Sequence, residues 1–574
     1  MCGIFCSISR HGFITPDPAT KALLHNRGPD SSGQHQVLVD TGPRNDTLEP
    51  PPLHAIFHST VLSLRGKSVV GQPLRDGDVG SILCWNGEAW SIGHQVLAGN
   101  DSQIIFNKLL AASSNVESPE QSARAVVALL ASIKGPYAFV FYDAPHKLLY
   151  YGRDCLGRRS LLRKTTTDDT FILSSLCDNA SGESWIEVEA DGISVIDLSA
   201  ASSNQPLPLH RHIPHRLRTE QTSEDLYFML PFPAMNRGFE DGALPSKIDV
   251  VDTLKQSLQT SIELRTQHVR EAYPAAKDGD AFCEAKTAIL FSGGLDCTIL
   301  ARMCHDLLPL GETIDLLNVA FENPRIHGKL DAGVSPYKLC PDRITGRSSY
   351  DELVNVCPGR RWRLVEIDVP YSKTTSHRAT VMSLMHPHNT EMDLSISYAL
   401  YFASQGTGQI YAPNCDKSDM PYTTPAHVLL SGLGADELFG GYQRHATAFA
   451  RHGYEGLLDE LELDFSRLGK RNLGRDDRVI SDSGKEVRFP YLDEDFISLS
   501  LRLPVTAKCN FGTPQEESSE DPATFLEPAK RALRLLAWHL GMKRVAAEKK
   551  RAIQFGARTA KMETGKTKGT HVLV

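Results

Sequence analysis

The chain has 574 residues, a formal net charge of −8 and 41% hydrophobic residues. This length exceeds what one hydrophobic core supports, so we expect two or more domains, and the mild negative charge gives no case for a nucleic-acid partner. The 12 cysteines include no close Cys-x-x-Cys pair, which indicates a reducing compartment rather than a disulfide framework or a zinc site. With no secretory signal pattern and no apolar run of membrane length, we expect a cytoplasmic protein without a membrane partner.

The first predicted domain, residues 1–199, begins with Met1 followed by Cys2. A small side chain at position 2 permits removal of Met1, which would leave Cys2 as the first residue. Its α-amine, with a pKa of ~7.7–8.0, would then accept the proton of its own thiol, so that one residue supplies both nucleophile and base. A small buried cysteine is the alternative interpretation.

Four short segments decide between these interpretations. They are Met1-Cys2-Gly3-Ile4, Arg27-Gly28-Pro29-Asp30, Trp85-Asn86-Gly87-Glu88 and Gly99-Asn100-Asp101. Their order and spacing resemble class II glutamine amidotransferases, the N-terminal-nucleophile family. The resemblance implies that Cys2 attacks glutamine, that Asn86 and Gly87 supply the oxyanion-hole donors, and that Glu88 and Asp101 hold the α-ammonium group of glutamine.

One position departs from this family. Where the family has an arginine that binds the α-carboxylate of glutamine, this chain has Val61 in Val61-Leu62-Ser63-Leu64. Loss of a buried charge-assisted pair costs roughly 1.5–3 kcal/mol. Arg65 is the candidate replacement, although strand alternation does not place it at the same point. The sequence therefore predicts an intact nucleophile and leaves glutamine recognition open.

We expect a linker over residues 200–247, because prolines and polar residues interrupt regular structure there. This stretch also carries His210, His212 and His215. Three histidines without an acidic or cysteine partner nearby are more often a solvated loop than a metal site, and we expect the loop.

The second predicted domain, residues 248–574, begins with an amphipathic helix over residues 250–268. An apolar strand over residues 288–291 then stops at Ser292-Gly293-Gly294-Leu295-Asp296 and a helix follows. The glycines allow close approach of a ligand, and the helix N-terminus offers free N–H groups to an anion. The spacing is neither a P-loop nor a dinucleotide fingerprint; it resembles the pyrophosphate loop of ATP pyrophosphatases. An ordinary strand-to-helix turn is the alternative.

A continuous apolar strand over residues 313–321 predicts a parallel sheet of the doubly wound kind, with ligand at the carboxyl ends of its strands. A second glycine-rich element, Ser431-Gly432-Leu433-Gly434-Ala435-Asp436, repeats the pattern of the first. We expect Asp296 and Asp436 to bind Mg²⁺, a hard ion that shares oxygen ligands with a nucleotide. The predicted ATP-binding residues are Leu290, Ser292, Gly293, Gly294, Leu295, Asp296, Val319 and Gly432.

These motifs, followed by Val487-Arg488-Phe489-Pro490-Tyr491-Leu492-Asp493 and Lys530-Arg531-Ala532-Leu533-Arg534, resemble the glutamine-dependent asparagine synthetases along nearly the whole chain. Within them, Pro341-Asp342-Arg343-Ile344-Thr345-Gly346-Arg347 and Arg551-Ala552-Ile553-Gln554-Phe555-Gly556 are similar to the group of asparagine synthetase domain-containing protein 1. The implied fold is mixed α/β, an α+β N-terminal-nucleophile amidotransferase sandwich followed by a doubly wound α/β ATP pyrophosphatase domain.

The resemblance also implies a two-site reaction. Cys2 releases ammonia from glutamine, ATP with Mg²⁺ adenylylates aspartate or another small carboxylic acid, and ammonia displaces AMP. Lys530 would neutralise the charge that develops on the phosphate. The sequence leaves open a homodimer, a different acid substrate and a non-catalytic ATP-binding protein.

A second departure lies in the synthetase motif, where Leu433 replaces a glutamate that is thought to assist attack by the nitrogen nucleophile. Leucine neither accepts a proton nor stabilises an ammonium ion, so we expect the substitution to affect amide formation rather than adenylylation.

For the basic stretch over residues 543–568 we expect a solvated tail. The alternative is that Lys549 to Gln554 fold over the nucleotide.

Overall fold

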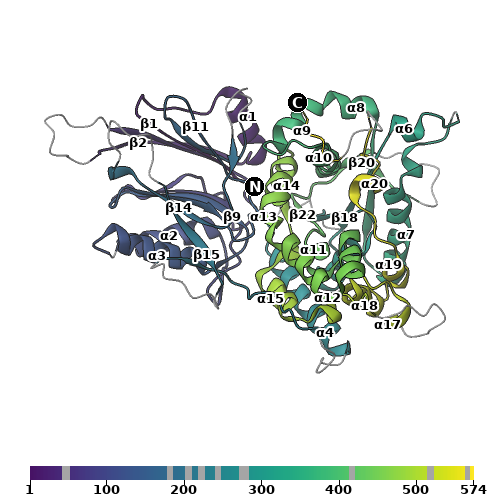
Figure 1. The fold of residues 1–574 in the computed structure, drawn as a ribbon. Helices are drawn as coiled ribbons and strands as arrows, with labels where there is room; N and C mark the ends of the chain where they lie inside the picture. Colours follow the sequence, from purple (N-terminus) through teal and green to yellow (C-terminus); the bar gives the residue numbers. More distant parts are fainter. Residues whose placement is uncertain are drawn as a thin grey trace. The chain divides into compact units, whose positions relative to one another are not determined.

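The computed structural model of the chain describes residues 1–41, 52–114, 116–177, 185–200, 210–217, 226–239, 247–269, 284–331, 333–412, 421–512, 522–562 and 569–573. These residues form two compact units, each of which is described by itself (Figure 1). The first unit comprises Met1–Pro231, Ser383–His388 and Leu468–Gly484. The second comprises Phe232–Met382, Asn389–Arg467 and Lys485–Val574.

Two sheets make up most of the first unit. The six-stranded sheet has the order β13-β11-β12-β1-β3-β2, formed by β1 (Gly3–Ser9), β2 (Ser31–Val39), β3 (Leu53–Val61), β11 (Leu162–Thr165), β12 (Phe171–Ser174) and β13 (Ile186–Glu187). The seven-stranded sheet has the order β16-β15-β14-β10-β9-β5-β4, formed by β4 (Leu74–Arg75), β5 (Ile82–Gly87), β9 (Tyr137–Asp143), β10 (Leu148–Arg153), β14 (Gly192–Asp197), β15 (His210–Arg216) and β16 (Phe228–Met229). A small third sheet joins β6 (Ser91–Ile92), β7 (Gln95–Val96) and β8 (Ile133–Lys134).

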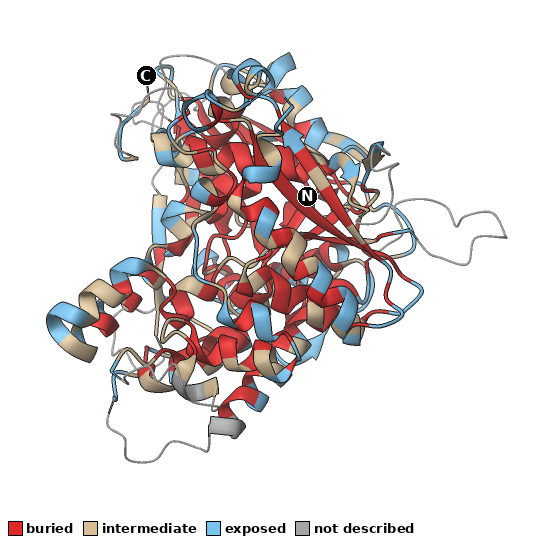
Figure 2. Ribbon diagram, turned by 90° about the vertical axis from the view of Figure 1, so that its right-hand side faces the viewer, coloured by how far each residue is buried: buried red, intermediate tan, exposed pale blue. Residues whose placement is uncertain are grey.

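The residues of β9 show how the layers of the first unit pack. Ala138, Val140 and Tyr142 belong to the core between the two sheets, together with residues of β1 and β3. Alternate residues, including Phe139 and Phe141, belong to a second core with the helices α2 (Asp101–Ser114) and α3 (Pro119–Ala131). Because successive side chains of a strand face opposite sides, a strand covered on both faces is buried throughout. Figure 2 shows buried residues concentrated along such strands.

The first unit differs from the predicted domain of residues 1–199 in two ways. Strand β15 lies within the predicted linker and pairs with β14, so the unit continues to Pro231. Two helices from the C-terminal half, α13 (Leu468–Arg471) and α14 (Leu473–Ser481), also belong to it. The helices α13 and α14 lie far in the sequence from the rest of the unit, and the prolines and histidines of β15 lower its strand propensity, so local patterns do not reveal these segments.

The second unit contains a seven-stranded sheet in the order β21-β20-β19-β18-β17-β22-β23. Its strands are β17 (Thr287–Leu290), β18 (Ile314–Phe321), β19 (Trp362–Val369), β20 (Thr407–Ile410), β21 (Pro421–Thr423), β22 (Val428–Leu430) and β23 (Glu486–Arg488). The pairs from β19 to β23 are parallel, and β20 and β21 add an antiparallel edge. The strand order reverses between β17 and β22, which makes their carboxyl ends the topological switch point where ligands bind in such sheets.

Figure 1 shows helices around this sheet. They are α4 (Lys247–Thr266), α5 (Leu295–Leu307), α6 (Pro324–His327), α7 (Pro341–Val356), α8 (Tyr371–Ser376), α9 (Arg378–Met385), α10 (Glu391–Gln405), α11 (Ala435–Phe439), α12 (Gln443–Ser466), α15 (Glu494–Arg502), α16 (Val505–Lys508), α17 (Pro522–Phe525), α18 (Arg531–His539), α19 (Lys543–Ala547) and α20 (Ile553–Gly556). The expected helix over residues 250–268 and the expected strands at β17, β18 and β22 are confirmed.

Two candidate active sites

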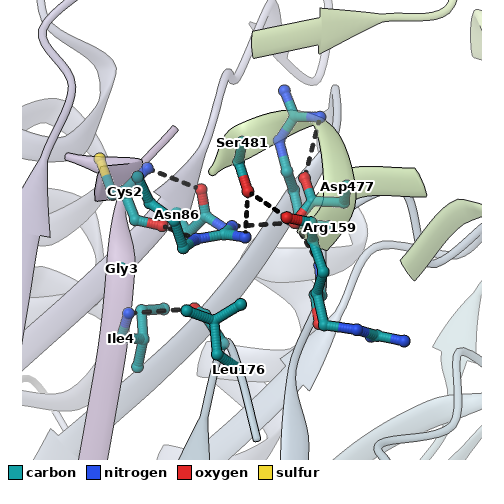
Figure 3. Close-up of polar contacts among 12 residues, drawn as sticks. Cys2, Gly3, Ile4, Asn86, Arg159, Leu176, Asp477 and Ser481 are labelled. Carbon is teal, nitrogen blue, oxygen red and sulfur yellow. Dashed lines mark hydrogen bonds and ion pairs between the residues drawn. The ribbon is translucent and has the colours of Figure 1, made fainter. Parts of the chain in front are cut away.

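The first candidate site surrounds Cys2, which immediately precedes β1 of the first unit. The backbone N–H of Cys2 donates to Asn86 Oδ1 over 3.0 Å, as Figure 3 shows. Gln72 Nε2 lies 4.0 Å from Cys2 Sγ. Gln72 Oε1 accepts the N–H of Trp85 at 2.8 Å. The structure therefore brings Cys2 and Asn86 together as the sequence predicts, and adds Gln72.

The side-chain Nδ2 of Asn86 is the atom of this site that best indicates a bound ligand. Asn86 Oδ1 is used by Cys2, while Nδ2 is buried and has no hydrogen-bond partner within the described ranges. A buried donor without a partner costs ~1–3 kcal/mol, so such groups are kept where a ligand satisfies them. Gly87 is the next residue and ends β5. This geometry fits an oxyanion hole beside the thiol of Cys2.

We expect Asn86→Asp to reduce glutamine hydrolysis by ~10²–10³ in kcat, the usual effect of losing one oxyanion donor. The new carboxylate keeps the acceptor for the N–H of Cys2 and removes the donor. Steady-state release of glutamate measures the effect. Asn107→Asp on the exposed face of α2 is the matched control, and equal rates for both variants would contradict this role.

Two of the predicted glutamine-binding groups have structural partners. Arg65 donates to the carbonyls of Ala89 and Leu97 at 2.8 and 2.7 Å and lies 3.5 Å from Glu88 Oε2. Asp101 Oδ2 accepts from Trp85 Nε1 and from the N–H of Ala89 at 3.1 and 2.9 Å. Burial raises the pKa of Asp101, against the lowering effect of Arg65. These contacts brace the chain after β5, so a role for Arg65, Glu88 and Asp101 in binding glutamine stays a prediction.

Val61 is the last residue of β3, and it is 5% exposed. Its carbonyl accepts the N–H of Asp30 at 2.9 Å, so its backbone links β3 to the Arg27-Gly28-Pro29-Asp30 segment. The valine side chain supplies no charge at this position. Arg65 uses two of its five N–H donors on the carbonyls of Ala89 and Leu97, so its replacement of the arginine of the resembling family stays a prediction.

The second candidate site lies at the switch point of the second unit. Leu290 ends β17, Leu295 begins α5 and Val319 lies in β18. Between them, Ser292 Oγ accepts the N–H of Gly294 at 3.3 Å. Gly293 has a φ of +79°, and a Cβ there would stand 2.5 Å from the N of Gly346 in α7. Only glycine fits this point, so the loop is held against α7 with its N–H groups at the start of α5.

Lys530 joins the two acidic residues that the sequence predicts to act together. Its Nζ lies 2.6 Å from Asp296 Oδ2 and 2.6 Å from Asp436 Oδ1. Burial alone would lower the pKa of Lys530, but the two carboxylates hold it above its usual value. Burial alone would likewise raise the pKa of Asp436, which Lys530 and Lys550 instead hold well below its usual range. Lys530 and Asp436 are therefore both charged at neutral pH.

The carboxylates of Asp296 and Asp436 fit a Mg²⁺ ion that is shared with phosphate oxygens. Asp296 Oδ1 is buried and has no hydrogen-bond partner in the described part of the chain. Gly432 lies directly against Asp296, since a Cβ there would be 2.8 Å from that residue's own Cβ. Two carboxylates are few for a protein-only site but are typical of Mg²⁺ bound together with a nucleotide.

Three residues near this pair are not among the predicted site residues. Lys550 forms an ion pair with Asp436 Oδ2. Tyr442 donates its hydroxyl to Glu437 Oε1 at 2.7 Å, while Glu437 Oε2 is buried and has no partner among the residues that the structure describes. Burial and the neighbouring Asp436 raise the pKa of Glu437. Glu437 is adjacent to Asp436 in sequence, which was the one available signal; Lys550 is not near either motif.

The C-terminal stretch is not a solvated tail where the structure describes it. Besides the Lys550 contact, Arg551 Nη1 donates to Thr345 Oγ1 at 3.2 Å. The N–H of Phe321 donates to the carbonyl of Ala557 at 3.1 Å. The expectation of a solvated tail is wrong for these residues, and the alternative, a segment that lies beside the second site, agrees with the contacts.

The histidines of the predicted linker form part of a strand, so the expected solvated loop is also wrong. His210 Nδ1 lies 2.8 Å from the hydroxyl of Tyr151, and the ring of His215 packs 4.4 Å from that of Phe228. Burial lowers the pKa of His210 to about 4. Across the described ranges, no group of three or more His, Cys, Asp or Glu residues is arranged to hold a metal ion.

Asp342, the second residue of α7, is a buried carboxylate near the second candidate site, and it is 6% exposed. Burial raises its pKa to about 7, although Arg551, Lys550 and Arg558 act to lower it. In the unfolded chain it ionises near pH 3.9. Its contribution to stability is therefore complete below about pH 4 and is lost as the pH rises towards 7.

We expect Asp342→Asn to remove this pH dependence. Between pH 4 and pH 8, the free energy of unfolding of the wild type should fall by up to about 4 kcal/mol more than that of the variant. The reason is that about three pKa units separate the folded and unfolded states of Asp342. Urea unfolding at several pH values measures the slope. Asp351→Asn, on the exposed face of the same helix, is the control, and an unchanged slope in Asp342→Asn would refute the assignment.

Comparison with known proteins shows the family to which the chain belongs. The asparagine synthase family model matches residues 450–568. The chain is 33% identical to asparagine synthetase domain-containing protein 1 of Bos taurus, over 99% of this chain and 97% of that protein. It is also 33% identical to the Homo sapiens protein of that name, over 98% of this chain and 96% of that protein. The chain belongs to the family of asparagine synthetase domain-containing protein 1.

More distant similarities cover less of the chain or are weaker. A putative glutamine-hydrolysing asparagine synthetase of Methanocaldococcus jannaschii is 44% identical over 16% of this chain and 17% of that protein. A solved glutamine phosphoribosylpyrophosphate amidotransferase from B. subtilis is 14% identical over 58% of this chain and 69% of that chain, with a TM-score of 0.25, which is too low to support an argument about the fold. Among the described residues, no helix combines the length and apolar character that crossing a membrane requires.

Proposed function

We propose that this protein is a glutamine-dependent carbon–nitrogen ligase that forms an amide on a small carboxylic acid, with aspartate as the first candidate. The observation that carries the proposal is Lys530, held 2.6 Å from both Asp296 and Asp436 beside the Ser-Gly-Gly loop. This arrangement of a cation, two carboxylates and a helix N-terminus suits a pyrophosphate group. The names of the asparagine synthetase relatives support the same reaction class.

In the first half-reaction, the thiolate of Cys2 attacks the amide carbon of glutamine. Asn86 Nδ2 and the N–H of Gly87 would stabilise the oxyanion of the tetrahedral intermediate. Collapse releases ammonia and leaves a thioester, which water hydrolyses to glutamate and free thiol. The reaction requires the α-amine of Cys2 as base and hence removal of Met1.

In the second half-reaction, a carboxylate oxygen of the acid attacks the α-phosphorus of ATP, and pyrophosphate leaves. Lys530 would neutralise negative charge on the phosphates, and the N-terminus of α5 would bind them. Mg²⁺ held by Asp296 and Asp436 would supply further charge neutralisation when bound. Ammonia then attacks the acyl carbon of the adenylate, and AMP leaves as the amide forms.

Leu433 favours a second candidate function, the same reaction on an acid other than aspartate. Its N–H donates to Ser431 Oγ at 3.3 Å, so it lies in the loop after β22 where the resembling synthetases have glutamate. An apolar side chain there removes an acceptor for ammonium or for a polar substrate group, and so changes which acids fit.

Pyrophosphate–ATP exchange over a panel of acids tests the proposal and separates the two substrates. Exchange with aspartate supports asparagine formation, and exchange with another acid alone supports the second candidate. Nucleotide-dependent thermal stabilisation without exchange on any acid would instead show a non-catalytic ATP-binding protein and overturn the proposal. We expect a cytoplasmic location, which imaging of a tagged full-length chain checks.

A further inference from the structure

Arg27, the last residue of α1 (Pro18–Arg27), joins Cys2 to a helix from the far end of the sequence. Its Nε donates to the carbonyl of Cys2 at 3.2 Å. Its Nη1 donates to Ser481 Oγ at 2.5 Å, and its Nη2 donates to Asp477 Oδ2 at 2.8 Å. Asp477 and Ser481 lie on α14, four positions apart and therefore on one face of the helix. Arg27 thus makes directed contacts with the nucleophile residue and with α14.

The ion pair of Arg27 with Asp477 is fully buried, since both side chains are 0% exposed. Asp477 Oδ2 also accepts the N–H of Ser160 at 3.1 Å, and Arg159 lies 3.8 Å from Asp477 Oδ1. A buried ion pair is weak evidence for stability, because desolvation offsets much of the attraction. Its directional bonds nevertheless fix the plane of the guanidinium group.

Other contacts hold α14 itself in place within the first unit. Arg478 Nη1 donates to Ser160 Oγ and to Glu187 Oε1, each at 2.8 Å. Arg478 Nε donates to the carbonyl of Leu384 at 3.0 Å. Figure 3 shows Asp477 and Ser481 facing the cluster that contains Cys2 and Asn86. Arg27 therefore meets a fixed partner rather than a mobile side chain.

The backbone of Cys2 is held from both sides as a result. Its N–H binds Asn86 Oδ1 at 3.0 Å and its carbonyl accepts from Arg27. Rotation of the peptide group between Cys2 and Gly3 would move Sγ relative to Asn86 Nδ2, the proposed oxyanion donor. A displacement of about 1 Å at a reacting atom costs on the order of 10²-fold in rate.

We propose that Asp477 and Ser481 are positioning residues for the nucleophile Cys2, acting through Arg27. This inference rests on the proposed glutaminase function of Cys2 and assigns part of that site to the C-terminal half of the chain. A fragment that ends before residue 468 would therefore lack Asp477 and Ser481, the partners of Arg27 on α14. It would still contain every residue predicted to contact glutamine.

The test compares Asp477→Asn, Ser481→Ala and a control in the full-length protein. Asparagine at position 477 has nearly the same shape and still accepts the N–H of Ser160, but it leaves Arg27 without its anion. In Asp477→Asn and Ser481→Ala, we expect the kcat for glutamine hydrolysis to fall about 10- to 100-fold relative to the wild type, with KM within about twofold. The substitutions change the geometry of acyl transfer and not the binding of glutamine. Ammonia-dependent AMP formation should remain at the wild-type rate.

The control is Asp476→Asn, which removes a buried ion pair with Arg475, 2.8 Å long, from the same helix. It should leave glutamine hydrolysis near the wild-type rate. Equal losses in Asp476→Asn and Asp477→Asn, or a wild-type kcat in Asp477→Asn, would overturn the inference. A parallel fall in ammonia-dependent activity would also overturn it, because it would show general damage.

A second measurement separates this inference from the proposed function. The rate at which a glutamine-like electrophile alkylates Cys2, followed by peptide mass spectrometry, reports the position of Sγ without any turnover. Alkylation that is about 10- to 100-fold slower in Asp477→Asn than in Asp476→Asn supports the positioning role even if the wild type releases no glutamate. Equal alkylation rates in the two variants would contradict it.

Discussion

Replacement of Lys530 with methionine is expected to lower ammonia-dependent AMP formation by ~10²–10³, the loss typical of removing one group aimed at charge in a transition state. Methionine keeps most of the length of the side chain and removes its charge. Lys530 is 3% exposed and contacts both Asp296 and Asp436, whereas the ion pair of the more exposed Lys550 is with Asp436. Production of AMP with saturating ammonia, which bypasses Cys2, measures the effect.

The same substitution should change stability in a way that an inert lysine would not. Without Lys530, the partly exposed carboxylates of Asp296 and Asp436 lose their shared cation and repel each other, so the free energy of unfolding should fall. Mg²⁺ should therefore raise the Tm of the variant more than that of the wild type. Lys549→Met, at an exposed position of the same C-terminal half, is the control. Wild-type AMP formation by Lys530→Met would refute the proposed role.

Cys2→Ala is expected to divide the activities of the protein. Glutamine-dependent amide formation should fall by at least ~10³, because no group remains to form the thioester. Ammonia-dependent formation of AMP and amide should remain within about twofold of the wild type, because none of the residues proposed for the second site is Cys2. Parallel assays with glutamine and with ammonium chloride give both values.

The control for Cys2→Ala is Cys155→Ala, which removes another cysteine thiol of the first unit. It should leave both activities unchanged. If Cys2→Ala keeps its glutamine-dependent activity, the nucleophile lies elsewhere. If it instead loses ammonia-dependent activity to the same extent, the substitution has damaged the fold and the division into two half-reactions fails.

The glycine-rich loop of the second site could be predicted from the sequence because its residues are local. The loop from Ser292 to Asp296 joins β17 to α5 within a few residues, so the punctuation of strand, glycines and helix is visible in the chain. Cys2 and Asn86 are far apart in sequence, and only the resemblance to a family brought them together. The structure confirms that they meet.

The contacts that the sequence did not predict are those made by side chains without a local pattern. Asp477 lies in a helix whose neighbours, Arg27 and Ser160, are hundreds of residues away. Lys550 belongs to a basic stretch of the kind that is usually solvated, and its contact with Asp436 depends on the path of the C-terminal chain. Strand β15 was missed because prolines and histidines lower strand propensity, whereas pairing with β14 overrides it.

The transfer of nitrogen between the two sites is the central claim, and one labelling experiment tests it most directly. The full-length protein is incubated with ATP, Mg²⁺, aspartate or the acid found by exchange, and glutamine labelled with ¹⁵N in its amide. We expect ¹⁵N in the amide product, with AMP, pyrophosphate and glutamate formed in equal amounts, and loss of the label in Cys2→Ala. Glutamate released without any AMP, or AMP formed with no ¹⁵N in the product, would contradict it.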